Sequence, residues 1–116
     1  MTAAPANAAG TCDFSHRAED SKDRVGRIPG PVGNCSLRQG NSGDAVKALQ
    51  TTLWKCYGQN ISRDGDFGPN TKSALIHAQR AAGASDDGIF GPETFSKLKW
   101  AFFEGTEANC HQYSHG

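Results

Sequence analysis

The chain is short, has no net charge and is rich in glycine: its 116 residues carry 12 basic and 12 acidic side chains and include 14 glycines. A chain of this length forms one small domain with a modest core, and its many glycines indicate short elements joined by tight turns. The charge balance argues against a nucleic acid partner, which requires clustered basic side chains, and the lack of a long apolar run argues against a membrane span.

Residues 1–10, MTAAPANAAG, resemble the end of a secretory signal peptide. The small residues of ANA and the following AG suit a signal peptidase, but the apolar segment that should precede them is missing. A start Met placed on a clipped secretory precursor would explain this pattern. The alternative is an ordinary disordered leader.

Residues 11–34 are polar, and we expect them to form an irregular N-terminal arm. The charged run RAEDSKDR is typical of a solvated face, and the Pro and Gly residues of 29–33 indicate an extended connection. The structured part is expected to begin near Leu37.

Three helices are expected after Leu37, at about residues 43–57, 69–82 and 92–103. Apolar side chains recur at helical spacing in each segment, and a glycine follows each of them. Proline occupies the first position of the second and third helices, where its missing N–H costs nothing. The sequence therefore predicts an all-α fold, a small three-helix bundle.

The stretch DGDFGPNT at residues 64–71 recurs as DGIFGPET at residues 87–94. In each copy Asp-Gly predicts a tight turn, the Phe anchors that turn in the core, and Gly-Pro leads directly into a helix. Because neither copy can bury its apolar face alone, we expect the two copies to pack on each other and on the first helix.

Two kinds of ligand-binding loop are excluded by the spacing of this repeat. An EF-hand loop that began at Asp64 would need Gly at its sixth position and Glu at its twelfth, but the chain has Pro69 and Leu75 there. A phosphate loop would need Gly-Lys-Ser/Thr after the glycines, and that sequence does not follow them.

Four cysteines in a small chain favour an oxidising compartment and two disulfides. They are Cys12, Cys35, Cys56 and Cys110. Four cysteines allow three pairings, and the sequence does not choose among them. A zinc site is a weaker alternative, because only His111 and His115 have a suitable spacing and they lie in an expected tail.

No group of side chains converges on a catalytic arrangement. A hydrolase would need an activated metal-bound water, a paired acid and base, or a Cys/His nucleophile. His77 lies in the middle of an expected helix, the other histidines lie in expected tails, and most carboxylates belong to turns or helix starts. We therefore expect a chain that is not an enzyme, with no catalytic residue, metal or cofactor.

A longer pattern includes the repeat. Leu37, Gly40 and Gly43 are followed by Val46, Leu49 and Gln50, and then by both Asp-Gly loops. This pattern resembles the small three-helix peptidoglycan-binding domain of bacterial cell-wall hydrolases. The resemblance implies a domain over residues 35–110 and a C-terminal tail over residues 111–116. The chain departs from the family at Ala78, where a large apolar residue is usual.

The resemblance also implies a disulfide pairing. In secreted actinobacterial relatives, a Cys just before the first Leu-x-x-Gly can pair with one just after the third helix. By that resemblance Cys35 would pair with Cys110, which leaves Cys12 with Cys56.

The function that the resemblance implies is binding. We expect a secreted, extracellular or wall-associated monomer that binds the glycan or stem peptide of peptidoglycan. The candidate ligand edge consists of the two Asp-Gly loops and the helix starts beside them, where backbone N–H groups face outward. Its residues are Arg63, Asp64, Asp66, Asn70, Asp87 and Thr94.

Several of these side chains have a competing structural role. For Asp64, Asp87 and Thr94, a role in turns and caps is the favoured interpretation. Three aromatic side chains could stack on a sugar, but packing is the expected use of each. They are Trp54, Tyr57 and Trp100.

Two other functions remain open. One is a secreted inhibitor or pro-domain-like partner of an extracellular enzyme, because the three-helix scaffold resembles the helical pro-regions of some metalloproteases. Residues 11–34 would then be the interaction arm for an extracellular protein. The other is a targeting fragment of a larger cell-wall hydrolase.

Overall fold

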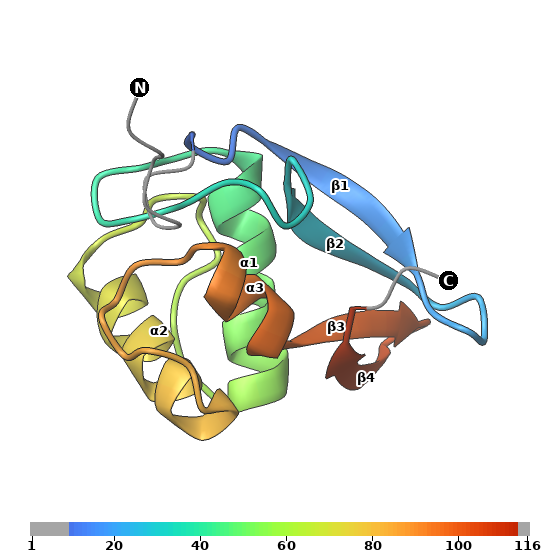
Figure 1. Cartoon of the computed structure of the whole chain (residues 1–116). Helices are drawn as coiled ribbons and strands as arrows, with labels where there is room; N and C mark the ends of the chain where they lie inside the picture. Colours follow the sequence, from blue (N-terminus) through green and yellow to red (C-terminus); the bar gives the residue numbers. More distant parts are fainter. Residues whose placement is uncertain (1–9, 114–116) are drawn as a thin grey trace.

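The computed structural model describes residues 10–113, which form three helices and one four-stranded antiparallel sheet (Figure 1). The helices are α1 (Asp44–Tyr57), α2 (Pro69–Ala82) and α3 (Pro92–Lys97). The strands are β1 (Phe14–Glu19), β2 (Val25–Gly30), β3 (Lys99–Glu104) and β4 (Glu107–Gln112). Helix α1 lies between the sheet and α2, so its two sides contact different layers. No helix within residues 10–113 is long and apolar enough to cross a bilayer.

The prediction of an all-α three-helix bundle is wrong. Helices α1 and α2 form where they are expected, but α3 ends at Lys97 and not at residue 103. The backbone is extended from Leu98 onward, and the aromatic run KWAFFE forms β3. A short apolar run fits either a helix or a strand by its spacing, and pairing with β4 decides for the strand here.

The prediction of an irregular arm over residues 11–34 is also wrong. Strands β1 and β2 pair in continuous antiparallel register from Phe14 opposite Gly30 to Glu19 opposite Val25. Ala18 and Ile28 are buried on the inner face of this hairpin. Most of the charged residues that suggested a solvated loop lie on the other face or in the turn, which is how a half-buried antiparallel sheet distributes polarity.

The expected chain ends are only partly described. Strand β4 continues to Gln112, so the predicted tail of residues 111–116 begins inside the sheet. Residues 114–116, which include His115, lie outside the described residues, as do residues 1–9 of the predicted leader.

The disulfides connect Cys12 with Cys35 and Cys56 with Cys110, so the pairing implied by the family resemblance is wrong. The first pairing follows from a backbone contact, because the N–H of Cys12 donates to the carbonyl of Ser36 at 2.9 Å. The second joins the end of α1 to β4, since β3 and β4 place Cys110 beside that helix. The zinc alternative therefore loses its thiolate ligands, and no three His, Cys, Asp or Glu side chains within residues 10–113 could hold a metal ion.

An aromatic cluster forms the core between α3 and the sheet. The rings of Phe90 and Trp100 meet edge to face with centroids 5.8 Å apart, and Phe95 lies 5.5 Å from Trp100. Trp100 is fully buried, and its indole N–H donates to the carbonyl of Phe95 at 3.1 Å. The expectation that Trp100 packs in the core is confirmed.

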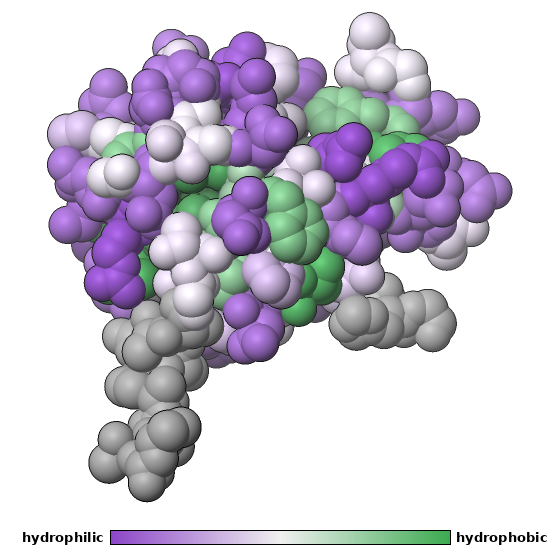
Figure 2. Space-filling view, turned by 90° about the horizontal axis from the view of Figure 1, so that it is seen from above, coloured by the Kyte–Doolittle hydropathy of each residue, from purple (hydrophilic) through white to green (hydrophobic). Residues whose placement is uncertain are grey.

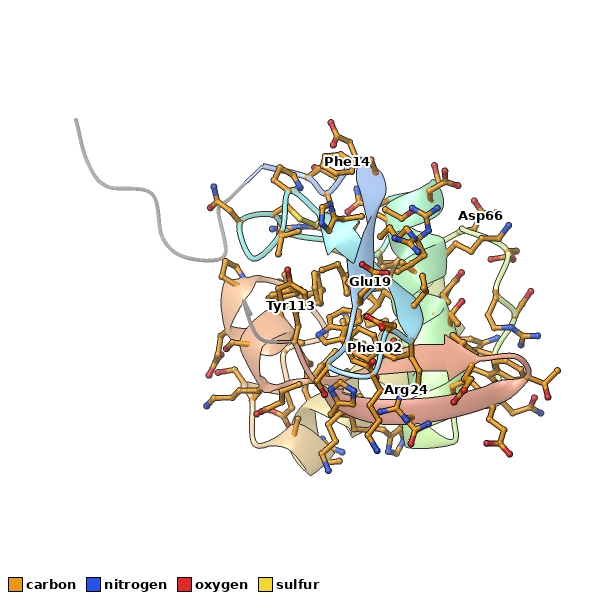
Figure 3. The ribbon with its side chains drawn as sticks, turned by 90° about the vertical axis from the view of Figure 1, so that its right-hand side faces the viewer. Phe14, Glu19, Arg24, Asp66, Phe102 and Tyr113 are labelled. Atoms are coloured by element: carbon orange, nitrogen blue, oxygen red, sulfur yellow. A yellow bond between two sulfur atoms is a disulfide. The ribbon has the colours of Figure 1, made fainter. Side chains whose placement is uncertain are left out.

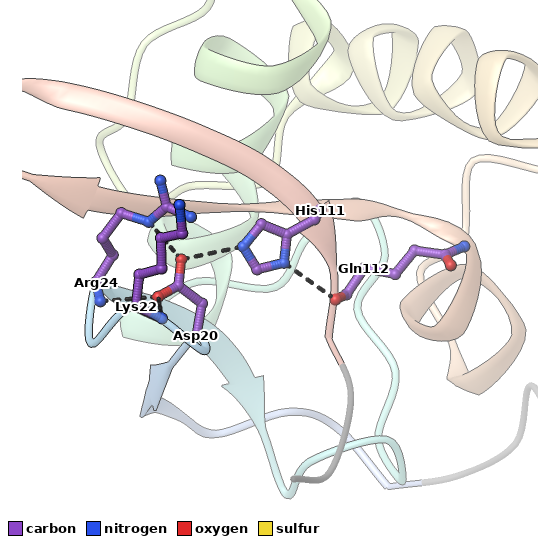
Figure 4. A network of polar contacts seen from close by, with 5 residues as sticks. All are labelled: Asp20, Lys22, Arg24, His111 and Gln112. Atoms are coloured by element: carbon purple, nitrogen blue, oxygen red, sulfur yellow. Dashed lines mark hydrogen bonds and ion pairs between the residues drawn. The ribbon is translucent and has the colours of Figure 1, made fainter.

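A buried carboxylate fixes the β1–β2 turn to β4 (Figure 4). The side chain of Asp20 has no exposed surface and accepts the main-chain N–H groups of Lys22 and Arg24, each at 2.9 Å. It also accepts the Arg24 guanidinium and, at 3.1 Å, Nε2 of His111, whose ring stacks on Phe102.

These hydrogen bonds set the acidity of Asp20. Burial raises the pKa of this carboxyl group. The hydrogen bonds from the main chain and guanidinium of Arg24, from His111 and from Lys22 together outweigh burial and hold the pKa far below its ordinary value of 3.8. The charged form is therefore the one that the folded chain stabilises.

Removal of the Cys56–Cys110 bridge should cost more stability than removal of Cys12–Cys35. The two bridges span sequence separations of 54 and 23 residues. The chain-entropy model then gives losses of about 4 and about 3 kcal/mol, respectively. Urea unfolding of the C56A/C110A and C12A/C35A variants measures both losses. The reverse order would show that effects in the native state outweigh loop entropy.

The substitution Asp20→Asn should lower the melting temperature at neutral pH, and this difference should shrink as the pH falls below 3.8. Because the folded pKa of Asp20 lies below 3.8, its carboxylate stabilises the fold above that pH, and the contribution is lost as pH falls through the folded pKa. Thermal unfolding followed by circular dichroism between about pH 7 and pH 2 tests this sign. Asp23→Asn in the same turn is the control. A gap that stays constant down to pH 2 would contradict an electrostatic role.

Candidate functional site

The first Asp-Gly loop is held by the buried side chain of Gln50 in α1. The amide nitrogen of Gln50 donates to the carbonyl of Asp66 at 2.9 Å and to the hydroxyl of Thr71 at 3.0 Å. It also reaches Oδ1 of Asp64 at 3.3 Å, while its amide oxygen accepts the N–H of Gly65 at 2.9 Å. This one side chain therefore fixes the turn and joins it to the start of α2.

The second loop repeats this arrangement one helix later. The amide nitrogen of Gln79 in α2 donates to the carbonyl of Ile89 and the hydroxyl of Thr94, both at 3.0 Å. It also reaches Oδ1 of Asp87 at 3.2 Å, and its oxygen accepts the N–H of Gly88 at 3.0 Å. The repeat in the sequence is thus a repeat of one hydrogen-bonded unit.

Both units depend on glycine in the turn. Gly65 and Gly88 have φ angles of 82° and 73°, which side chains with a Cβ rarely adopt. Gln50 and Gln79 are both fully buried, and every buried side-chain polar atom in the described part of the chain has a partner. The loops are therefore rigid frames that carry outward-facing side chains.

Three of the predicted site residues take part in these frames. Asp64 and Asp87 receive the hydrogen bonds of their turns, and Thr94 is buried. The pKa of Asp64 is lowered, chiefly because the N–H of Asp66 donates to its carboxylate. Their contact with a ligand remains a prediction, since each already has an internal partner.

The other three predicted residues are exposed around the first loop. Arg63 lies over the ring of Trp54, 3.8 Å from its centroid, and donates to the carbonyl of Ile61 at 3.1 Å. Asp66 and Asn70 are exposed at the loop and at the start of α2, and Figure 3 shows Asp66 beside α1.

Residues 37–43, which we call the strap, join the two loops into one edge. Leu37 exchanges two backbone hydrogen bonds of 2.8 Å with Phe90 of the second loop. Gly40 donates to Phe67 of the first loop at 2.9 Å, and Gly43 donates to Gly65 at 2.9 Å. The strap and both loops together form what we call the loop edge.

A polar groove of about 200 Å³ opens on the loop edge, beside the second loop. The strap contributes Arg38 and Gln39, α2 contributes Lys72, and the loop contributes Asp87. The stem of Lys72 lies against Gly88, where a Cβ would approach its Cε to 2.9 Å. Two cations, an amide and a carboxylate line this groove, and these groups suit the carboxylates, amides and hydroxyls of a polar polymer.

Of these groove residues, only Asp87 was predicted from the sequence. Arg38 and Gln39 lie between Leu37 and Gly40, two residues of the family pattern, and both are exposed. Their position, exposed between residues that the fold requires, could have indicated a binding role from the sequence. Nothing in the sequence indicated such a role for Lys72, because its place beside the strap depends on how the loops pair.

The remaining surface favours a polar ligand. Phe14 is the large apolar side chain that stands out in the described part of the chain, with 45% of its surface exposed. Figure 2 shows the face above the sheet and helices of Figure 1 as largely hydrophilic, with hydrophobic atoms in small patches. Of the histidines within residues 10–113, His16 and His77 are exposed and His111 belongs to the Asp20 network.

Comparison with known proteins identifies the helical part of the chain. The model of a family described as "Putative peptidoglycan binding domain" matches residues 42–98. The zinc D-Ala-D-Ala carboxypeptidase of Streptomyces albus G is 43% identical over 65 residues, which are 54% of this chain and 26% of that protein. A protein named as a probable N-acetylmuramoyl-L-alanine amidase, from Bacillus licheniformis, is 40% identical over 68 residues, 56% of this chain and 19% of that protein.

A solved structure shares the fold as well. The crystal structure of a peptidoglycan-binding protein from Clostridioides difficile, in complex with glutamine hydroxamate, is 31% identical with a TM-score of 0.55. The match covers 72% of this chain and 55% of that one. The matches thus cover 55% of that protein and 26% and 19% of the two other relatives. Through residues 42–98, which hold all three helices and both Asp-Gly loops, the chain belongs to the peptidoglycan-binding domain family.

Proposed function

We propose that the chain is a secreted, non-catalytic module that holds bacterial peptidoglycan at the loop edge. The observation that carries this proposal is the polar groove between the strap, α2 and the second loop, on a domain of the peptidoglycan-binding family. The groove brings side chains from three separate segments into one place, and the rigid loop frames hold those segments.

The groove residues suit the chemistry of this polymer. Peptidoglycan presents hydroxyls, N-acetyl groups and peptides with free carboxylates. Arg38 and Lys72 are suited to a carboxylate, and the amide of Gln39 can donate to and accept from an N-acetyl or peptide group. Arg63, Asp66 and Asn70 would extend the contact along the same edge toward the first loop.

The two disulfides support an extracellular or wall-associated location. Such bonds persist in oxidising compartments and are rare in the cytosol. For an isolated domain of this size they also supply a large share of the total stability.

The relatives favour the alternative in which this module is the targeting part of a larger cell-wall hydrolase. In the carboxypeptidase and the amidase, the matched region is 26% and 19% of the whole protein. The same kind of domain thus occurs there as a small part of a longer chain, which supports a targeting part of a larger cell-wall hydrolase. The inhibitor alternative gains no such support, because β1 and β2 pack into the sheet and do not form a separate arm.

The oxidised chain should sediment with insoluble peptidoglycan and remain in the supernatant with cellulose or chitin. Arg38→Gln and Lys72→Gln should each weaken the interaction about tenfold, the size expected for one hydrogen bond to a charged group. Lys55→Gln, which alters an exposed cation of α1 outside the groove, is the matched control. Wild-type binding by both groove variants would move the site elsewhere, and a wild type that never sediments would refute the module.

Substitutions at the first loop locate the rest of the contact. Arg63→Gln, Asp66→Asn and Asn70→Ala are expected to weaken sedimentation less than the groove variants do, because they lie outside the concave part of the edge. Larger losses at the first loop than in the groove would assign the main contact to the first loop instead.

The chain should release no soluble fragments from labelled peptidoglycan. Hydrolysis would need an activated water or nucleophile beside a proton donor, and the groove holds no histidine or cysteine. Release of label is measured over hours with a muramidase as the positive control. Release by the purified chain that disappears in a groove variant would show that the module is catalytic.

A further inference from the structure

A second and larger groove, of about 360 Å³, lies away from the loop edge between α1 and the first hairpin. Its walls come from β1 and β2 on one side and from α1 on the other, with β3 at one end. We call it the hairpin groove. Only its α1 wall falls inside residues 42–98, so most of the groove is built by parts of the chain outside the family match.

The groove exists because two strands separate. Strands β2 and β3 pair only at Val25 and Phe103, and α1 lies alongside the gap beyond that pair. Gly26 leaves no side chain in the way, since a Cβ there would collide with the carbonyl oxygen of Ala101. The hydroxyl of Thr52 in α1 accepts the N–H of Ala101 at 3.1 Å, which fixes the helix to β3. The walls are therefore held at a defined spacing.

Two cationic residues line this groove, Arg27 from β2 and Lys47 from α1. The Arg27 guanidinium donates to the carbonyl of Ser15 at 3.4 Å. A guanidinium carries five N–H donors, so Arg27 retains donors for a further acceptor. Cations on two walls of one concave site are complementary to a single anionic group.

The register of the hairpin places a further cation next to Arg27. Arg27 lies directly opposite Arg17 on β1, and like charges in such a pair destabilise a sheet. Arg17 forms an ion pair with Glu19 at 3.4 Å, and 57% of the Arg17 side chain and 50% of the Glu19 side chain are exposed. A bound anion beside Arg27 would reduce the repulsion between the two guanidinium groups further.

The rest of the lining is apolar or carries hydroxyls. Val25, Ala48 and Ala101 line the groove, and Ser15 and Thr51 provide polar groups near the cations. An apolar floor beneath two cations suits a carboxylate carried on a short aliphatic residue. A phosphate or sulfate would use the charge of this groove and leave its apolar floor unused.

One acidic side chain, Asp44, also lines the groove at the start of α1. There it interacts favourably with the positive end of the helix dipole. It should also repel a bound carboxylate and keep the affinity modest. Asp44 therefore provides a variant whose effect on binding has the opposite sign.

We propose that the hairpin groove is a second subsite, which binds the free terminal carboxylate of a short aliphatic peptide such as a peptidoglycan stem that ends in alanine. The identification of that peptide with peptidoglycan rests on the proposed function. The strap leads along the chain from the groove of the loop edge to Asp44 of the hairpin groove. Two weak subsites on one domain would raise the apparent affinity for a polymer through effective concentration.

The first test is a nuclear magnetic resonance titration of the oxidised full chain with N-acetyl-D-alanyl-D-alanine. Saturable shifts are expected at the amides of Gly26, Ala48 and Ala101, and the C-terminal amide of the same dipeptide should not produce them. Arg27→Gln and Lys47→Gln should each raise the dissociation constant about tenfold, as expected for the loss of one charge-assisted contact. Asp44→Asn should strengthen binding, and Lys55→Gln, which alters an exposed cation of α1 that does not line the groove, is the control.

Three results would overturn the proposal: equal binding of the acid and the amide, shifts confined to the loop edge, or a dissociation constant that Arg27→Gln and Lys47→Gln leave unchanged while their spectra show a folded chain. Sedimentation separates this failure from failure of the proposed function. If the chain sediments with peptidoglycan but the groove does not respond to the dipeptide, only the second subsite is refuted. If the groove binds the dipeptide and the chain does not sediment, the subsite stands and the wall-binding function is refuted.

Discussion

The hydrogen bonds of two buried glutamines are the interaction on which the helical half of this protein depends. Gln50 and Gln79 each connect the helix that carries them to the following loop and to the start of the next helix. A buried polar group that loses its partner costs about 1–3 kcal/mol, so neither loop can shift without leaving several groups unsatisfied. The backbone of both loops is consequently held in a fixed position, as a binding surface requires.

Helix α1 connects the first loop to the sheet. Gln50 reaches the first loop on one side of the helix, while Thr52 accepts a hydrogen bond from β3 on the other. The Cys56–Cys110 bridge then ties the end of the same helix to β4. One helix therefore belongs to both layers, and the grooves on the two sides of the molecule are fixed relative to each other.

This arrangement suits a polymer better than a compact partner. The surface combines a polar groove at the loop edge with a hairpin groove of mixed lining, and it lacks a broad apolar face in the view of Figure 2. A repeating ligand can occupy several modest subsites at once, so none of them needs high affinity. The matched region is also a small part of two longer relatives, so under the proposed function it would hold the rest of such a chain close to its polymer.

The features that the sequence determined are local. Asp-Gly, Gly-Pro and the glycines after the helices fix turns and helix starts within a few residues, so the repeat, α1 and α2 were predictable from the printed chain. The family could be predicted for the same reason, since its pattern consists of those turn residues and the apolar positions beside them.

The tertiary structure decided what depends on distant partners. β3 is a strand because β4 pairs with it, the β1–β2 hairpin buries only a few residues of a polar run, and the disulfides follow from strands that the all-α prediction lacked. Arg38 and Lys72 share a groove only because the strap pairs with both loops, a contact between segments that no local pattern encodes.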